Sequence, residues 1–288
     1  MQFNSKKFEG MNYGNNSLDN EYRTPDGHLI EFKESVKDLG IFFDSKLQFH
    51  CHIVALVDQG QSLAGWSLRV FKSRGVIVML TILKSLLVSQ MEYACVIWSP
   101  TSQNHINMIE SVQRKYTLRF ACFQEYDQSR GMLVCVASYE ERLKTLGIYS
   151  LERRRERYMI LYIFKIIIGL VPNPGLQWND NNYNSRRGIR IPPKYPVSNV
   201  TWVKRARASS FFFVGPTLYN LLPRHLRELV PDPNPTKKTV LKFKTKLDKF
   251  LANFRDNPGT SANSLLNILK DNRTIMDRTS HTEGYHTN

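Results

Sequence analysis

The strongest constraint on the fold is the regular spacing of apolar residues between residues 104 and 120, where one recurs every three or four positions. That spacing gathers the apolar side chains on one face of an α-helix. The same periodicity predicts helices over about residues 50–74 and 237–254, and longer apolar runs predict buried helices over 76–98 and 151–170. The chain is therefore expected to be mainly α-helical, with its core between helices.

Turn-forming residues mark the segments that are not helical. Before residue 48, turns such as Pro25-Asp26-Gly27 predict a short β-hairpin region made of short strands, including one strand over 36–43. Five prolines and a run of asparagines preclude a long element over 172–208, which is expected to be a loop. Over 256–288 the polar composition predicts a disordered tail, apart from one short helix around Leu265.

The positive charge is concentrated in one part of the chain. The formal net charge is +15, and residues 140–255 contain 23 lysines and arginines against 8 aspartates and glutamates. Within them, residues 185–207 have seven basic residues and no acidic one, and Trp202 lies next to Lys204 and Arg205. Such an excess favours a polyanionic partner, because neutralised phosphates release counterions. The alternatives are charge that only keeps the protein in solution, and a solvated loop.

The helix expected over 104–120 has basic residues on its polar face. Lys115 and Arg119 form a ridge beside Tyr116, and Glu110 and Arg114 are spaced for an i,i+4 ion pair. Lysines line the polar face of the last predicted helix in the same way. Aromatic rings next to cations hold single-stranded and hybrid nucleic acids. The alternative is that the rings belong to the core and that the lysines only keep each helix soluble.

No set of residues suited to catalysis is present. Nucleotidyl transfer requires two metal ions held by clustered carboxylates, and the sequence contains no pair of adjacent aspartates. Adjacent carboxylates occur only at Glu140-Glu141, at the expected start of a helix whose dipole they would stabilise. The glycines are too scattered for a phosphate-binding loop, and the common hydrolase motifs are missing. No catalytic residue and no cofactor is therefore predicted.

The four cysteines do not have the spacing of a metal site. Cys51, Cys95, Cys122 and Cys135 form no Cys-x-x-Cys pair and follow no secretory signal. They are expected to be reduced core residues of an intracellular protein, cytoplasmic or nuclear. His50-Cys51-His52 comes nearest to a zinc site, but adjacent side chains diverge, so no metal is predicted. No membrane partner is expected either, because both long apolar runs are interrupted by charge or too short to cross a bilayer.

A series of short motifs runs through the chain between residues 3 and 250. In chain order they are Phe3-Asn4-Ser5-Lys6-Lys7-Phe8, Val36-Lys37-Asp38-Leu39-Gly40-Ile41 followed by Asp44-Ser45-Lys46-Leu47-Gln48-Phe49 and His52-Ile53, Glu92-Tyr93-Ala94 with Ile97-Trp98-Ser99-Pro100, Ile109-Glu110-Ser111-Val112-Gln113-Arg114-Lys115, Tyr139 to Leu151, Arg153-Arg154, Phe211 to Pro223, and Phe243-Lys244 with Leu247. Together and in this order they resemble the carboxyl-terminal part of the reverse transcriptases of non-LTR retrotransposons, of the jockey-like or LINE type. Phe8, Val214 and Tyr219 stand where that family usually has cysteine, arginine and tryptophan.

The resemblance implies roles and an organisation. Lys7 corresponds to a lysine near the incoming nucleotide, and Leu39 and Gly40 to the primer-grip turn. The implied regions are residues 1–48 as the end of the palm with primer-grip-like strands, 49–135 as a thumb-like helical bundle, 136–255 as a basic helical extension with the loop at 172–208, and 256–288 as the tail. The family's catalytic aspartates would lie upstream, in the catalytic centre of the palm, which this chain is expected to lack.

The sequence thus predicts a truncated reverse-transcriptase-like chain that binds RNA or an RNA–DNA template–primer duplex without polymerising it. The predicted contacts are Lys7, Leu39, Gly40, Lys115, Arg119, Arg153, Arg154, Arg186, Arg187, Arg190, Lys204, Arg205 and Arg207. Two alternatives stay open. One is a helical protein that self-associates or docks a partner through the surface exposed by the missing palm, and the other is a pseudogene fragment without a function.

Overall fold

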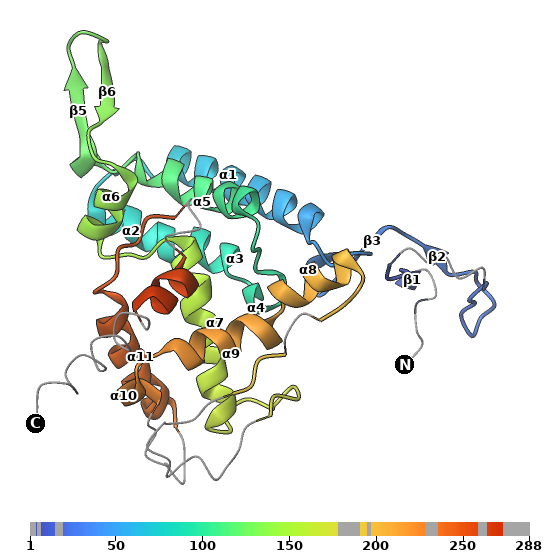
Figure 1. The fold of residues 1–288 in the computed structure, drawn as a ribbon. Coiled ribbons are helices and arrows are strands. Elements are labelled where there is room, and N and C mark those ends of the chain that lie inside the picture. Colours follow the sequence, from blue (N-terminus) through green and yellow to red (C-terminus); the bar gives the residue numbers. More distant parts are fainter. Residues whose placement is uncertain are drawn as a thin grey trace, which may run out of the picture.

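The chain is described by a computed structural model in which residues 4, 7–14, 20–177, 191–194, 197–227, 236–258 and 264–272 are placed. Most of these residues are helical, and their named strands form three sheets of two strands each. Short strands lie at one end, helices make the body, and one hairpin stands away from the helices (Figure 1). The mainly α-helical fold class is confirmed, and the likeness to a polymerase thumb stays a prediction.

The strands before residue 48 form two small sheets. β1 (Glu9–Gly10) pairs in parallel with β2 (Glu31–Phe32), and β3 (Ser35–Asp38) pairs antiparallel with β4 (Ile41–Asp44). The single strand expected over 36–43 is therefore wrong. Leu39 and Gly40 have φ angles of 44° and 87°, and this left-handed pair makes the two-residue turn that joins twisted antiparallel strands.

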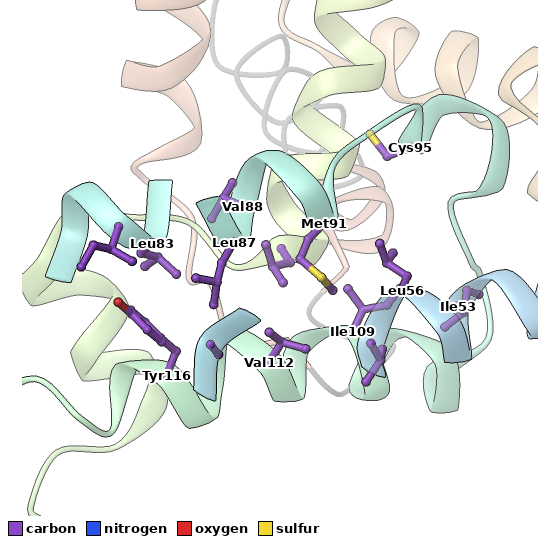
Figure 2. Close-up of a cluster of buried hydrophobic side chains, with 14 of the residues drawn as sticks. Ile53, Leu56, Leu83, Leu87, Val88, Met91, Cys95, Ile109, Val112 and Tyr116 are labelled. Carbon is purple, nitrogen blue, oxygen red and sulfur yellow. The ribbon is translucent and has the colours of Figure 1, made fainter. Parts of the chain in front are cut away.

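The carboxylate of Asp44 fixes the start of α1 (His50–Val70). It accepts hydrogen bonds from the backbone N–H of Gln48 at 3.0 Å and of Phe49 at 2.6 Å, so the hairpin and the helix are tied together. One face of α1 then packs on α5 (Gln103–Thr117). Figure 2 shows the contact, with apolar residues of both helices facing side chains from the segment between them.

The segment over 76–98 is not the single helix that its apolar run predicts. It consists of α2 (Val76–Ile82), the π-helix η2 (Leu83–Val88), α3 (Ser89–Met91) and α4 (Cys95–Trp98). Ala94 has a left-handed φ of 50°, which ends one helix and starts the next. The indole N–H of Trp98 donates to the Tyr93 carbonyl at 2.8 Å, which satisfies a backbone group freed by the break.

A hairpin and a short helix follow α5. The 3₁₀ turn η3 (Ala121–Phe123) leads into β5 (Gln124–Asp127) and β6 (Met132–Cys135), a hairpin that the sequence did not predict. α6 (Tyr139–Leu146) begins with a capping box between Ser138 and Glu141. The helix start expected at Glu140-Glu141 is thereby confirmed.

Glu110 connects three helices in the interior. Its carboxylate accepts hydrogen bonds from the Tyr139 hydroxyl and from the backbone N–H groups of Leu151 at 3.1 Å and Glu152 at 3.2 Å, at the start of α7 (Leu151–Ile167). The ion pair expected between Glu110 and Arg114 is therefore wrong, since the carboxylate is buried against α6 and α7 instead. Burial raises the pKa of Glu110, an effect that the hydroxyl of Tyr139 opposes.

The second half of α7 organises another core with the later helices. α8 (Thr201–Ser209), α9 (Phe211–Leu221), α10 (Arg224–Arg227) and α11 (Lys237–Leu251) follow it in the chain. The rings of Phe164 and Phe243 stack at 3.9 Å between α7 and α11. Pro216 lies inside α9 and has no N–H, and the Phe212 carbonyl that this leaves free accepts from the backbone N–H of Lys194 at 3.0 Å.

One expectation for the carboxyl-terminal half is revised and another is confirmed. The loop expected over 172–208 ends in a helix, α8, which begins at Thr201. Within the tail expected to be disordered, residues 265–272 form a helix, and its Leu265 and Leu269 are buried in the second core. The short helix predicted around Leu265 is thus confirmed, while the rest of that tail beyond 272 lies outside the described residues.

Two clusters of buried apolar side chains hold the described chain together. One contains residues from Ile41 to Leu151 and the other residues from Met159 to Leu269, so the change from one to the other occurs inside α7. α7 therefore belongs to both cores, its first turn to one and its remainder to the other. The division into a thumb-like bundle and an extension at residue 135 stays a prediction.

Candidate nucleic-acid interface

The turn between β3 and β4 projects from the surface and is held in place by α3 and α4. Leu39 is 80% exposed although it is apolar. The hydroxyl of Tyr93, in the break between α3 and α4, donates to the Leu39 carbonyl at 3.1 Å. The two residues that the sequence singled out here, Leu39 and Gly40, thus form an exposed and anchored turn.

A pocket of about 450 Å³ opens beside this turn. Its walls come from the hairpin, from α1 and from α3, and we call it the turn pocket. The side chains that line it include those of Lys37, Phe42, His52, Gln59, Gln90 and Tyr93. The volume falls within the range of about 300–1,000 Å³ that is usual for small-ligand sites.

His52 is the most unusual residue of the turn pocket. It is 5% exposed, and its Nε2 has no hydrogen-bond partner among the described residues. The ring contacts the indole of Trp98 edge to face at 5.1 Å. Burial lowers the pKa of His52, and the charge of Lys37 lowers it further. The imidazole is therefore neutral near pH 7, and its Nε2 is a buried polar atom without a partner among the described residues.

The other side chains of the turn pocket supply charge, ring surface and amide groups. The Lys37 ammonium lies 5.0 Å from the centre of the Phe42 ring. Tyr93 is 57% exposed, so its ring remains available for stacking. Gln90 Nε2 donates to Gln59 Oε1 at 3.1 Å, which leaves further donor and acceptor capacity on both amides.

α8 carries the second group of predicted contacts. Lys204, Arg205 and Arg207 are exposed, and an Nη1 of Arg207 donates to the Val197 carbonyl. Arg205 lines a second pocket, of about 410 Å³, together with residues 47–49 that lead into α1. The second pocket thus lies at the connection between β4 and α1, and the turn pocket is lined by Phe42 before that connection and His52 after it.

Lys115 and Arg119 are exposed but lie elsewhere. Both are at the carboxyl end of α5, whereas Arg205 lies near His105 at its amino end. At 1.5 Å per residue, Lys115 is about 15 Å along the helix from His105. Tyr116, between the two cations, is buried in the first core, so the stacking role considered for it is wrong.

The paired arginines of α7 are not available to a ligand in the way that the sequence predicted. Arg153 is 1% exposed, and its Nη2 donates to the Arg255 carbonyl at 3.0 Å. Arg154 binds the carboxylate of Glu92 with two nitrogens, one at 2.9 Å. The two side chains point in different directions because they are neighbours on a helix. Arg153 points into the interior, and Arg154 points toward Glu92, which follows α3. Arg153 is therefore not part of the interface, and the prediction that it contacts nucleic acid is wrong.

Two further arginines in the basic region are also paired. Arg157 binds the Asp248 carboxylate of α11, and Arg255 binds the Glu140 carboxylate of α6. The lysines of α11 differ from them, since Lys242, Lys246 and Lys249 are exposed as the sequence predicted. The excess positive charge therefore reaches the surface mainly on α8 and α11.

The remaining predicted contacts can be placed only in part. Lys7 is exposed, and its backbone N–H donates to the Asn4 carbonyl at 2.9 Å, which forms a turn. Arg186, Arg187 and Arg190 lie outside the described residues. Sequence reasoning missed Lys37, His52 and Tyr93 as contacts. Lys37 and Tyr93 belong to motifs already quoted, and nothing in the sequence marked His52 as a buried residue facing a pocket.

The cysteines and histidines do not assemble a metal site within the described ranges. The structure places no group of three or more histidine, cysteine, aspartate or glutamate side chains there that could hold an ion. The rings of His50 and His105 meet at 2.9 Å between Nδ1 and Nε2. Of the cysteines only Cys95 is buried, and Cys51 and Cys122 are exposed, which corrects the expectation that all four belong to the core.

In the part of the chain that is placed, every helix is too short or too polar to cross a membrane. Comparison with family models, with curated proteins and with solved structures finds no match to this chain.

Proposed function

We propose that the chain binds RNA or an RNA–DNA hybrid through the turn pocket and α8, and that it holds the nucleic acid without catalysing a reaction on it. The observation that carries the proposal is the composition of the turn pocket. An exposed cation, an exposed ring and an unpartnered ring nitrogen meet there, on Lys37, Tyr93 and His52.

Each of these groups suits one part of a nucleotide. The Lys37 ammonium suits a phosphate, and the Tyr93 ring suits the face of a base. Amide groups such as those of Gln59 and Gln90 hydrogen-bond base edges or a 2′-hydroxyl. The neutral imidazole of His52 adds a donor or an acceptor, depending on its tautomer. A single nucleotide bound in the turn pocket would lie beside the lysine, the tyrosine ring and the two amides.

α8 extends the proposed contact to neighbouring phosphates. Its exposed Arg205 lines a pocket together with Leu47, Gln48 and Phe49 of the β4–α1 connection, and Lys204 is exposed beside it on the helix. A strand that follows this connection from the turn pocket would meet both groups of cations. The resemblance of Val36 to Ile41 to a primer-grip turn supports the same location.

The proposal ends at binding because the sequence offers no paired aspartates for two metal ions. Retention of a template–primer duplex is thus the activity that we assign to this chain. The enzymatic activity of the reverse transcriptases that it resembles is not part of the proposal.

The proposal is tested by fluorescence anisotropy with a labelled RNA–DNA hybrid and with the matching single-stranded RNA. The variants Lys37→Glu and Tyr93→Ala are each expected to weaken binding about tenfold, since one phosphate contact or one stacked base is worth about 1–3 kcal/mol. Tyr93→Phe keeps the ring but loses the hydrogen bond to the Leu39 carbonyl. It should bind nearly as tightly as the original protein.

Matched controls use the same residue types outside the interface. Lys84 on η2 and Tyr126 on β5 are exposed and do not line the turn pocket. Lys84→Glu and Tyr126→Ala are expected to leave the dissociation constant within about twofold of the original, because a distant surface charge is largely screened by salt. Equal losses in the controls and in the pocket variants would refute the assigned site.

A further inference from the structure

The β5–β6 hairpin stands clear of the helices (Figure 1), and several of its apolar side chains are exposed. Tyr126 and Leu133 lie directly opposite each other on its two strands and are 63% and 56% exposed. Cross-strand neighbours point to the same face of a sheet, so the two side chains form one uncovered apolar surface. An isolated hairpin of two strands is at most marginally stable in water, and additional strands stabilise it.

The two edges of this hairpin differ in charge. β5 carries the acidic residues Glu125 and Asp127. β6 and the residue after it, from Met132 to Val136, contain no charged residue and no proline. Charges and prolines are the usual means by which edge strands avoid pairing with other chains. β6 has neither of them.

The hydrogen-bond pattern shows which backbone groups of β6 point outward. The N–H of Val136 donates to the Phe123 carbonyl at 3.1 Å. Hydrogen-bonded pairs alternate with non-hydrogen-bonded pairs in an antiparallel ladder, so the next bonded pair is Glu125 with Val134. The N–H and C=O groups of Leu133 and Cys135 are then directed away from β5, toward the open edge.

We propose that β6 is a self-association surface at which a second copy of this chain pairs antiparallel about Leu133. In that register the outward N–H of each Leu133 donates to the carbonyl of the other, and Met132 of one copy lies opposite Val134 of the other. The result is a sheet of four strands. Tyr126, the two Leu133 side chains and the second Tyr126 form a continuous apolar row across one face.

Charge excludes the corresponding pairing through β5. Antiparallel pairing about Tyr126 would place Glu125 of one copy opposite Asp127 of the other, twice, and pairing about Glu125 would oppose two copies of that residue. Like charges directly opposite each other destabilise a sheet. The acidic edge therefore stays unpaired, and the assembly closes as a dimer through β6.

Sedimentation velocity of the full chain over a range of concentrations tests the proposal. The protein is treated with nuclease and studied at high salt, so that the result does not depend on nucleic-acid binding. A concentration-dependent dimer is expected for the original chain. Leu133→Lys, which sets two lysines against each other at the two-fold axis, should be monomeric throughout. Leu241→Lys makes the same change at an exposed leucine of α11 and should still dimerise.

Disulfide trapping tests the register and does not depend on the stability of a variant dimer. In a background with Cys51→Ser and Cys122→Ser, Leu133→Cys should give a covalent dimer on mild oxidation, because directly opposed residues have Cα atoms about 5.5 Å apart. Tyr126→Cys, equally exposed but on β5, should not. A monomeric original chain at every concentration, a dimer that survives Leu133→Lys, or equal trapping at both positions would overturn the proposal. Each outcome is independent of the turn pocket.

Discussion

Adjacent residues of one type have different roles in this chain, and the arginines of α7 show it most clearly. Arg153 is buried and donates to a backbone carbonyl, whereas Arg154 binds the carboxylate of Glu92. Helical periodicity predicts which residues share a face. It does not predict what covers that face, because the covering groups come from positions about 60 and 100 residues away in the chain.

Replacement of the buried arginine should affect stability and not binding. Arg153→Ala removes a buried donor and leaves the Arg255 carbonyl without this partner, so we expect a loss of about 2–4 kcal/mol in the free energy of unfolding. Urea unfolding measures that loss. Anisotropy on the folded protein should give an unchanged dissociation constant for the hybrid, and a clear loss of affinity at full folding would return Arg153 to the interface.

Two carboxyls on α7, those of the buried Glu152 and the half-buried Glu156, predict an unusual pH dependence of stability. Burial raises the pKa of Glu152 to about 7 and of Glu156 to about 8. A carboxyl whose pKa is raised by folding binds its proton more tightly in the folded state. The stabilisation that such a carboxyl gives to the folded state is therefore fully present below pH about 4.5, the ordinary pKa of glutamate. It is lost as the pH rises through the raised pKa values.

The variant Glu156→Gln should remove part of this loss of stability at high pH. The neutral amide can still accept the hydrogen bond from the backbone N–H of Leu265, which Glu156 accepts at 3.1 Å. At pH 8 the variant is expected to be more stable than the original by on the order of 1–3 kcal/mol, and at pH 5 about equal to it. Urea unfolding at both pH values, with the exposed Glu125→Gln as control, measures the difference. An original protein as stable at pH 8 as at pH 5 would contradict the assignment.

At the scale of elements, α1 contains two glycines with different surroundings. A Cβ on Gly60 would lie 2.8 Å from the sulfur of Met91 and 3.2 Å from Val112, whereas on Gly65 its nearest neighbour would be Arg69 at 3.9 Å. Alanine favours a helix over glycine by about 1 kcal/mol. In a filled core, however, an added methyl costs about 1–3 kcal/mol.

The two alanine variants of α1 should therefore have opposite effects on the stability of the protein. Gly65→Ala is expected to stabilise the protein by about 0.5–1 kcal/mol, because space is free there. Gly60→Ala is expected to destabilise it by about 1 kcal/mol, because α1 would have to move away from Met91 and Val112. Thermal melts of both variants check this. Equal stabilisation would show that the contact between α1 and α5 is looser than described.

Elements with a clear period were predictable, and those that depend on local backbone geometry were not. The apolar spacing of residues 104–120 predicts α5 within a few residues. The left-handed Ala94 that divides the segment over 76–98 has no sequence signal, since left-handed φ is normally a property of glycine. The β5–β6 hairpin lacks the Asn-Gly or Asp-Gly turn that would announce it.

At the candidate site the same limit applies. The exposed cations Lys115, Arg119, Lys204 and Arg205 are identifiable from composition, and the turn at Leu39-Gly40 from its resemblance to a known motif. The turn pocket requires β3, α1 and α3 to meet, and no single segment encodes that. His52 becomes noteworthy only once its Nε2 is seen to be buried without a partner among the described residues.

At the scale of the whole molecule, the formal charge overstates the surface available to a polyanion. Arg154, Arg157 and Arg255 are paired with carboxylates, and Arg153 is buried. Among the described residues, exposed cations lie on α8, on α11 and beside the turn pocket, and Lys7, Lys84, Lys115 and Arg119 are exposed elsewhere. Binding is therefore expected to depend on a few phosphate contacts and not on the whole formal excess of +15.

The salt dependence of binding tests this account most directly. The dissociation constant of the original chain for a labelled RNA–DNA hybrid is measured by anisotropy at several salt concentrations from about 50 mM upward. About four to six phosphate contacts predict micromolar binding at low salt and a log–log slope of association constant against salt of about −3 to −5. No binding at the lowest salt, or an affinity that salt does not change, would contradict the claim that this chain holds nucleic acid.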